Sequence, residues 1–189
     1  MMSHTSSAGL FLLQTIFSLI TLVALLRFLF QLMRVDFYNQ ISQTVSRISD
    51  PLLRPLRRLI PATRRIDGAS LTLLLAMQML SIATLYGIDI NPLGLLMVAM
   101  AEILSLTATV FTWSIIVLVI MSWIQPQTRH PAISLLHQLT APIMQPLQRA
   151  LPATGSGIDL SPILALFAIK LVEFMLVAPL RDLAAIFIR

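Results

Sequence analysis

Four long apolar stretches dominate the pattern of hydrophobic and polar positions along the chain. They cover residues 10–33, 69–86, 93–124 and about 160–177, with a possible extension of the last to residue 188 past Pro179. Arg27 interrupts the first stretch close enough to its end for the charged group to reach the interface. A bilayer core of ~30 Å needs about 20 apolar residues in a helix. The pattern therefore predicts four membrane-spanning helices.

The third stretch is longer than one straight crossing requires, because residues 92–100 precede the part that corresponds to the first span. A helical extension, a tilted span and a re-entrant piece all fit this lead-in. The dipeptide Asn91-Pro92 before it is a helix-start signal.

Two connectors, residues 34–65 and 125–157, carry apolar residues at steps of three or four, which is typical of an amphipathic helix. The first stripe consists of Ile41, Val45, Ile48, Leu52, Leu56 and Leu59, and the second of Ile133, Leu136, Leu139, Ile143, Leu147 and Leu151. Such helices lie in the plane of the interface with the apolar face down. We expect both connectors to do so.

Local signals divide the first connector. Asp50 followed by Pro51 is typical of a helix N-cap with proline at the first helical position. This predicts two short helices with a break at Asp50. Pro55 is expected to kink the second helix and Pro61 to end it.

The segment at residues 50–63 returns at residues 141–154 with a constant offset of 91, and the offset becomes 92 afterwards. Ile66-Asp67 then corresponds to Ile158-Asp159. The chain is therefore a tandem repeat, which we divide into residues 1–90 and 91–189. The sequence predicts an all-α membrane protein in which each repeat contributes a span, a connector containing proline and arginine, and a second span.

Composition supports this class, since 57% of the residues are hydrophobic and 11% are charged, against about 25% charged residues in a soluble domain. The net charge is +5, and the first connector holds most of the arginines. The positive-inside rule places such a connector in the cytoplasm. We therefore expect an inner-membrane protein with cytoplasmic connectors, periplasmic termini and a first span that is not a cleaved signal.

The connector arginines are the candidate contacts with anionic lipid head groups or with a protein partner: Arg47, Arg54, Arg57, Arg58 and Arg149. Direct binding of nucleic acid is not expected, because aromatic residues are sparse in the connectors.

Polar residues also repeat inside the spans. Gln14, Ser18 and Thr21 share a helix face, and the offset matches them with Ser105, Thr109 and Thr112. Gln78 and Ser81 in the second span match Lys170 and Glu173. Polar side chains that face lipid are costly, so these faces are expected to point inward.

Lys170 and Glu173 are three residues apart and close enough to pair on a helix. A structural ion pair that fixes helix packing is one interpretation. An ion or proton pathway, or a ligand contact, is the other, and Glu102 in the third stretch could belong to it.

Catalytic chemistry is not indicated. The sequence has no glycine-rich phosphate loop, no paired-histidine motif and no cysteine. His130 and His137 in the second connector fit polar surface residues better than metal or haem ligands. We expect no enzyme, metal or cofactor.

The repeated motif resembles that of the YggT family, whose relatives include the YlmG proteins. The matching residues are Asp50, Pro51, Pro55, Arg57, Arg58, Pro61 and Asp67 in the first copy, and Pro142, Pro146, Arg149, Pro152, Gly155, Gly157, Asp159, Ser161 and Pro162 in the second. The second copy departs at Ala141, which stands where the first has Asp50, and the first has Arg64-Arg65 in place of the paired glycines.

The resemblance implies an integral-membrane protein without an established reaction, linked to osmotic tolerance, cell division, envelope organisation or, in plastids, cytochrome b6 haem attachment and nucleoid partitioning. We therefore expect a non-enzymatic scaffold or assembly factor that contacts lipid and either a membrane-protein partner or another copy of itself. The alternative is a small oligomeric channel or transporter with a polar path.

Overall fold

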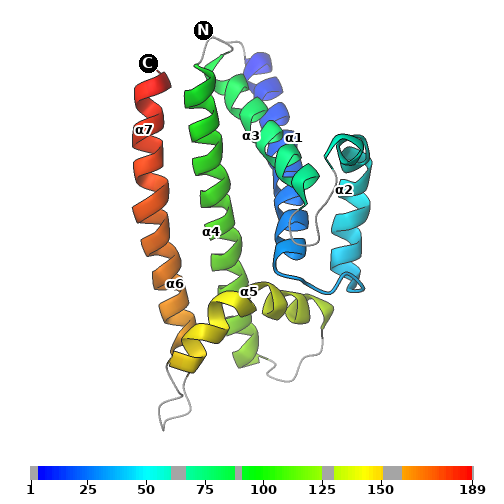
Figure 1. The fold of residues 1–189 in the computed structure, drawn as a ribbon, viewed down its shortest axis with the longest axis vertical. Coiled ribbons are helices and arrows are strands. Elements are labelled where there is room, and N and C mark those ends of the chain that lie inside the picture. Colours follow the sequence, from blue (N-terminus) through cyan, green and yellow to red (C-terminus); the bar gives the residue numbers. More distant parts are fainter. Residues whose placement is uncertain (1–3, 61–66, 88–90, 125–129, 151–158, 189) are drawn as a thin grey trace.

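A computed structural model describes residues 4–60, 67–87, 91–124, 130–150 and 159–188, and within these ranges it contains helices and no strands (Figure 1). The helices are α1 (His4–Leu32), α2 (Gln40–Leu59), α3 (Gly68–Tyr86), α4 (Pro92–Ile124), α5 (Pro131–Ala150), α6 (Ser161–Val172), the π-helical turn η1 (Glu173–Val177) and α7 (Ala178–Ile188). The predicted all-α fold is confirmed.

Four segments are long and apolar enough to cross a membrane: Ala8–Leu32, Gly68–Tyr86, Pro92–Ile124 and Ser161–Phe187. The protein is therefore a multi-pass membrane protein with the predicted number of spans. The lead-in at residues 92–100 is helical and continuous with the span, since α4 is one helix of 33 residues. This fits a helical extension or a tilted span and not a re-entrant piece. The fourth span takes the longer of its two predicted forms, because α6, η1 and α7 follow one another without a gap past Pro179.

The start of α1 and the end of α7 lie at one end of the molecule, and α5 lies across the other end (Figure 1). A single core joins the two repeats. It contains fully buried side chains from five helices, namely Leu25, Leu53, Leu74, Ile115 and Leu139. The first connector helix is thus part of the protein core through Leu53.

The predicted break of the first connector at Asp50 is wrong. Helix α2 runs without interruption from Gln40 to Leu59 and contains Pro51 and Pro55. An internal proline removes one backbone hydrogen bond and costs about 3 kcal/mol; burial of Leu53 between these prolines offsets part of that cost. The helix bends instead of ending, and its second part runs at a steep angle to the first (Figure 1).

Asn39 is the true N-cap of α2, and its side chain accepts a hydrogen bond from the backbone of Ile41 at 2.9 Å. The equivalent residue before α5 is His130, whose Nδ1 accepts the corresponding bond from Ala132 at 3.2 Å. The Asn39 amide also donates to the carbonyl of Pro131 at 2.7 Å. The starts of the two connector helices are therefore capped alike and bound to each other.

Helix α2 has three faces where the sequence pattern predicts two. Val45, Ser49 and Leu53 are buried against the protein. Ile48 and Leu52, from the same predicted stripe as Val45, are 55% and 40% exposed. The prediction of one membrane-facing stripe is therefore only partly right, because the apolar residues divide between a core face and an outer face.

Candidate functional site

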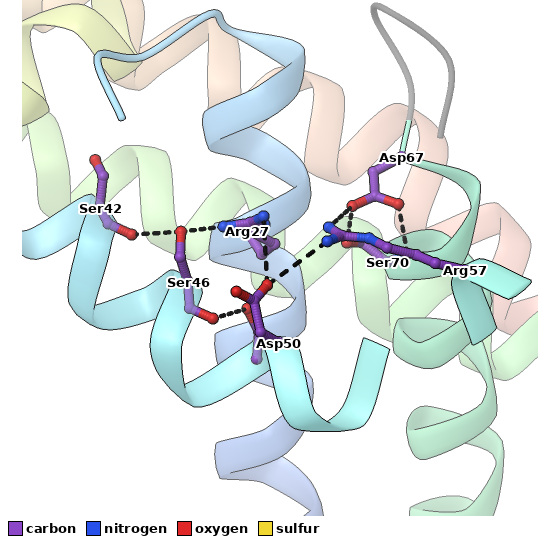
Figure 2. Close-up of polar contacts among 8 residues, drawn as sticks. Arg27, Ser42, Ser46, Asp50, Arg57, Asp67 and Ser70 are labelled. Carbon is purple, nitrogen blue, oxygen red and sulfur yellow. Dashed lines mark hydrogen bonds and ion pairs between the residues drawn. The ribbon is translucent and has the colours of Figure 1, made fainter. Parts of the chain in front are cut away.

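Arg27 of α1 lies at the centre of a polar network in the first repeat (Figure 2). Its guanidinium donates to the hydroxyl of Ser46 and lies 3.5 Å from a carboxylate oxygen of Asp50, both on α2. The ring of Phe37 covers the guanidinium at 5.3 Å, within cation–π range. Only 12% of the arginine side chain is exposed. The charge is therefore bound within the protein by α2, and the expectation that it reaches the interface stays a prediction.

Arg57 extends the network to the start of the second span. Its guanidinium lies 3.6 Å from Asp50 and donates to Asp67 at 2.8 Å. Asp67 is fully buried and caps α3, where it accepts hydrogen bonds from the backbone and hydroxyl of Ser70. Two arginines and two aspartates thus connect α1, α2 and α3 with no net charge (Figure 2).

The chemistry of Asp67 follows from these contacts. Burial by itself raises the pKa of the carboxyl, but hydrogen bonds from Arg57 and Ser70, together with the arginine charge, lower it below its usual range. The residue is a buried anion held by a specific cation. Asp50 also pairs with arginines, namely Arg27 and Arg57. It lies inside α2 and is therefore not the predicted N-cap.

The second repeat keeps part of this network in altered form. Gln148 stands at the position of Arg57, and Asp159 at that of Asp67. The Gln148 amide donates to Asp159 at 3.1 Å, and the backbone of Ser161 donates to the same carboxylate at 2.8 Å. Hydrogen bonding by Ser161 lowers the pKa of Asp159. The contact between connector and span therefore occurs twice, once as an ion pair and once as a neutral–charged hydrogen bond.

The other half of the network is absent from the second repeat. Leu118 stands at the position of Arg27, and Ala141 at that of Asp50. Both members of the pair are replaced together, so neither charge is left buried without its partner.

The structure divides the predicted contact arginines into two groups. Arg47, Arg54 and Arg58 of α2 are exposed, as is Arg149 of α5. Arg57 is partly buried and is bound by two aspartates, so its charge is largely engaged inside the protein. Its expected role as a surface contact stays a prediction.

The repeated prolines have different positions in the fold. Pro51, Pro55, Pro142 and Pro146 lie inside the bent connector helices, and Pro162 lies in the first turn of α6. Pro61 and Pro152 are outside the described residues.

Charged residues of the third and fourth spans form a second polar group. Lys170 and Glu173 pair at 2.7 Å, and Ser105 of α4 donates to Glu173 at 3.1 Å. Arg181 of α7 pairs with Glu102 of α4 at 3.0 Å. The Lys170 side chain is 67% exposed. Glu173 begins the π-helical turn, a form that often occurs at functional sites and that the sequence pattern did not predict.

The other polar residues of the spans do not all point inward. Thr21 is buried, Gln14 and Gln78 are half-buried, and Ser18 and Thr109 are exposed. The hydroxyl of Thr109 donates to a backbone carbonyl one turn earlier at 2.9 Å. A hydroxyl satisfied in this way can face lipid at low cost, which is why the prediction of an inward polar face is only partly right.

Comparison with known proteins assigns the family. The family model described as CCB3/YggT matches the chain twice, over residues 6–88 and 97–180. The chain belongs to the CCB3/YggT family. The two matches follow the two repeats, and each CCB3/YggT unit contains one connector helix and most of the two spans around it.

The relatives match over nearly their full length. An uncharacterized protein of Pseudomonas aeruginosa is 39% identical over 91% of this chain and 89% of its own. The uncharacterized protein YggT of Escherichia coli K12 is 37% identical over 86% of each chain, and a protein of Vibrio alginolyticus is 31% identical over 88% of this chain and 91% of its own. No solved structure matches the chain.

Within the described residues, the CCB3/YggT fold brings together no group of three or more side chains suited to hold a metal ion.

Proposed function

We propose that the protein is a non-enzymatic scaffold or assembly factor of the inner membrane, serving envelope organisation, division or osmotic tolerance. The supporting observation is the exposed arginine row of α2, formed by Arg47, Arg54 and Arg58. The buried network holds α2 against α1 and α3 through Arg27 and Arg57. The helix therefore presents its charge on a fixed support.

The arginine row can bind both anionic lipid and an acidic surface of a protein partner. Each arginine near a membrane surface contributes about 1 kcal/mol of attraction to anionic lipid, and a guanidinium can also bind a carboxylate of a protein partner in a bidentate manner. In this proposal the spans anchor the protein, while α2 recruits a cytoplasmic partner at the head-group level.

The test reverses the charge of the row without touching the network. In a strain that lacks the gene, the double variant Arg54→Glu/Arg58→Glu should insert at the normal level but fail to restore growth under osmotic stress and normal division. The matched control Arg54→Lys/Arg58→Lys keeps the charge and should retain most of the function. Full function after charge reversal would overturn the proposal.

The proposed topology has cytoplasmic connectors and periplasmic termini. Its support is the concentration of arginine in the first connector, because positive residues remain on the cytoplasmic side. An alkaline phosphatase fusion after Tyr86 should be active, and a fusion after Arg58 should be inactive. An active fusion at Arg58 would reverse the orientation.

A channel or transporter is the second candidate, and the exposed ionic group on α4, α6 and α7 is the observation that favours it. Such a path would need several copies around a common axis. Flux of ions or small solutes through proteoliposomes, lost in the Glu173→Gln variant, would support it over the scaffold.

A further inference from the structure

The second repeat contains a groove where the first repeat is filled. The groove lies between α4, α5 and α6 and has a volume of about 870 Å³. Its walls include Ile116, Met144 and Leu166. A volume of this size is within the range of ~300–1,000 Å³ typical of small-molecule sites.

The tandem repeat shows what occupies the equivalent place in the first half. The counterparts of those three wall residues are Leu25, Leu53 and Leu74, which are fully buried. The charged pair Arg27–Asp50 closes the same region. In the second repeat the smaller, uncharged Leu118 and Ala141 replace this pair, and the groove remains open.

One carboxylate lines the groove without the cation that its counterpart in the first repeat has. Asp159 lines the groove, and its hydrogen bonds come from Gln148 and Ser161. In the first repeat, the guanidinium of Arg57 binds the equivalent Asp67. Among the described residues no lysine or arginine lines the groove. The described part of the groove therefore contains the carboxylate of Asp159 and no cation to pair with it.

The position of the groove relates it to the membrane interface. It includes the last turns of α4, where Trp123 is 83% exposed, and the first turns of α6, where Ile163 is 64% exposed. Tryptophan is enriched at the level of lipid head groups. The wall residues Ile116 and Leu166 belong to spans, so lipid can approach the groove from the bilayer.

We propose that this groove binds a phospholipid whose head group carries a primary ammonium. The ammonium pairs with Asp159, and an acyl chain lies along Ile116 and Leu166. Gln145 and His137, which also line the groove, can donate hydrogen bonds to the phosphate. The negative charge of Asp159 disfavours anionic head groups, in contrast to the arginine row of α2. An apolar partner helix bearing a lysine would satisfy the same charge, but the bilayer supplies lipid at far higher concentration.

The experiment uses the full-length protein in nanodiscs containing a photoactivatable phosphatidylethanolamine, with the labelled residues mapped by mass spectrometry. The label should appear on the groove walls. Unlabelled phosphatidylethanolamine should compete at least about tenfold better than phosphatidylglycerol, because only its ammonium can donate a charge-assisted hydrogen bond to Asp159. Asp159→Asn should abolish this preference. The control Asp182→Asn, on α7, should keep it.

A second variant tests the comparison between the repeats. Leu118→Arg/Ala141→Asp transfers the internal pair of the first repeat into the groove and should abolish labelling while the protein keeps its unfolding temperature. If that variant does not fold, Ala141→Leu, which adds only apolar bulk, should reduce labelling. Two results of the labelling would overturn the proposal: equal competition by both lipids, or label outside the groove. A photo-crosslinker placed at Ile163 that captures a protein in place of lipid would also overturn it.

Discussion

At the scale of the residue, the repeats differ most clearly at the pair Arg27–Asp50. The first repeat has this charged pair between its span and its connector, and the second repeat has uncharged residues at both positions. Removing one member of a buried pair leaves the other charge without a counter-ion, whereas removing both is often close to neutral. The second repeat has lost both, as Leu118 and Ala141 show. Reading the repeat offset at these two positions could have revealed the pair from the sequence, because a basic and an acidic residue change to apolar ones together.

The pair should behave as a thermodynamic unit. Asp50→Ala should lower the free energy of unfolding by about 2 kcal/mol, below the full cost of a buried charge because the Asp50 side chain is 38% exposed. Arg27→Leu should cost less, since Asp50 keeps Arg57. The double variant Arg27→Leu/Asp50→Ala should be more stable than the two single costs added together predict. Equilibrium unfolding in detergent micelles measures all three, and additive costs would show that the pair is uncoupled.

Asp67 gives the protein an acid-sensitive contact. Its pKa is lowered in the folded state, so its contribution to stability is fully present above the unfolded value of about 4. That contribution is lost as the pH falls through the folded pKa. Unfolding temperatures measured between about pH 6 and pH 3 should therefore fall more steeply for the wild type than for Asp67→Asn. Parallel pH profiles for the two proteins would contradict this assignment.

At the scale of the element, local signals predicted some helix starts but neither the start at Asp50 nor the faces of the connector helix. Asp67 and Asn91 cap helices where their side-chain chemistry indicates. The break at Asp50 failed because burial of Leu53 and the ion pairs of Asp50 outweigh the local preference of proline. Periodicity also could not divide the connector stripe, since Val45 and Ile48 are equally apolar but only Val45 packs against the protein.

The three faces of α2 can be tested by cysteine labelling, because the chain has no native cysteine. In proteoliposomes, Arg47→Cys should react quickly with a water-soluble maleimide. Ile48→Cys should react poorly with that reagent but readily with a membrane-permeant one. Val45→Cys should react with neither until the protein is denatured. Equal rates at all three positions would indicate a helix detached from the protein.

At the scale of the whole molecule, the repeat is one architectural unit used in two ways. The first copy closes on itself through buried charge, whereas the second leaves a groove and carries the ionic group of the spans. Four spans and two connectors could be predicted from length, periodicity and the offset. The pairing of Glu102 with Arg181 could not, because 79 residues separate them and only the packing of α4 against α7 brings them together.

We predict that the ionic group contributes to association between copies of the chain. Lys170 and Arg181 are 67% and 47% exposed on surfaces of membrane spans, where uncovered charge is costly. With Glu102 and Glu173 the group has no net charge, so it can complement a copy of itself across a two-fold axis.

Exchanging the charges of Lys170 and Glu173 distinguishes ion pairs between copies of the chain from ion pairs within one copy. Lys170→Glu alone and Glu173→Lys alone should each weaken self-association in proteoliposomes, measured by energy transfer between labelled copies. Mixing the two variants should restore association at least to the wild-type level, since each copy then supplies the charge that the other lacks. Neither variant regains the pair within its own chain, so a mixture as weak as its components would confine the role of Lys170 and Glu173 to a single copy.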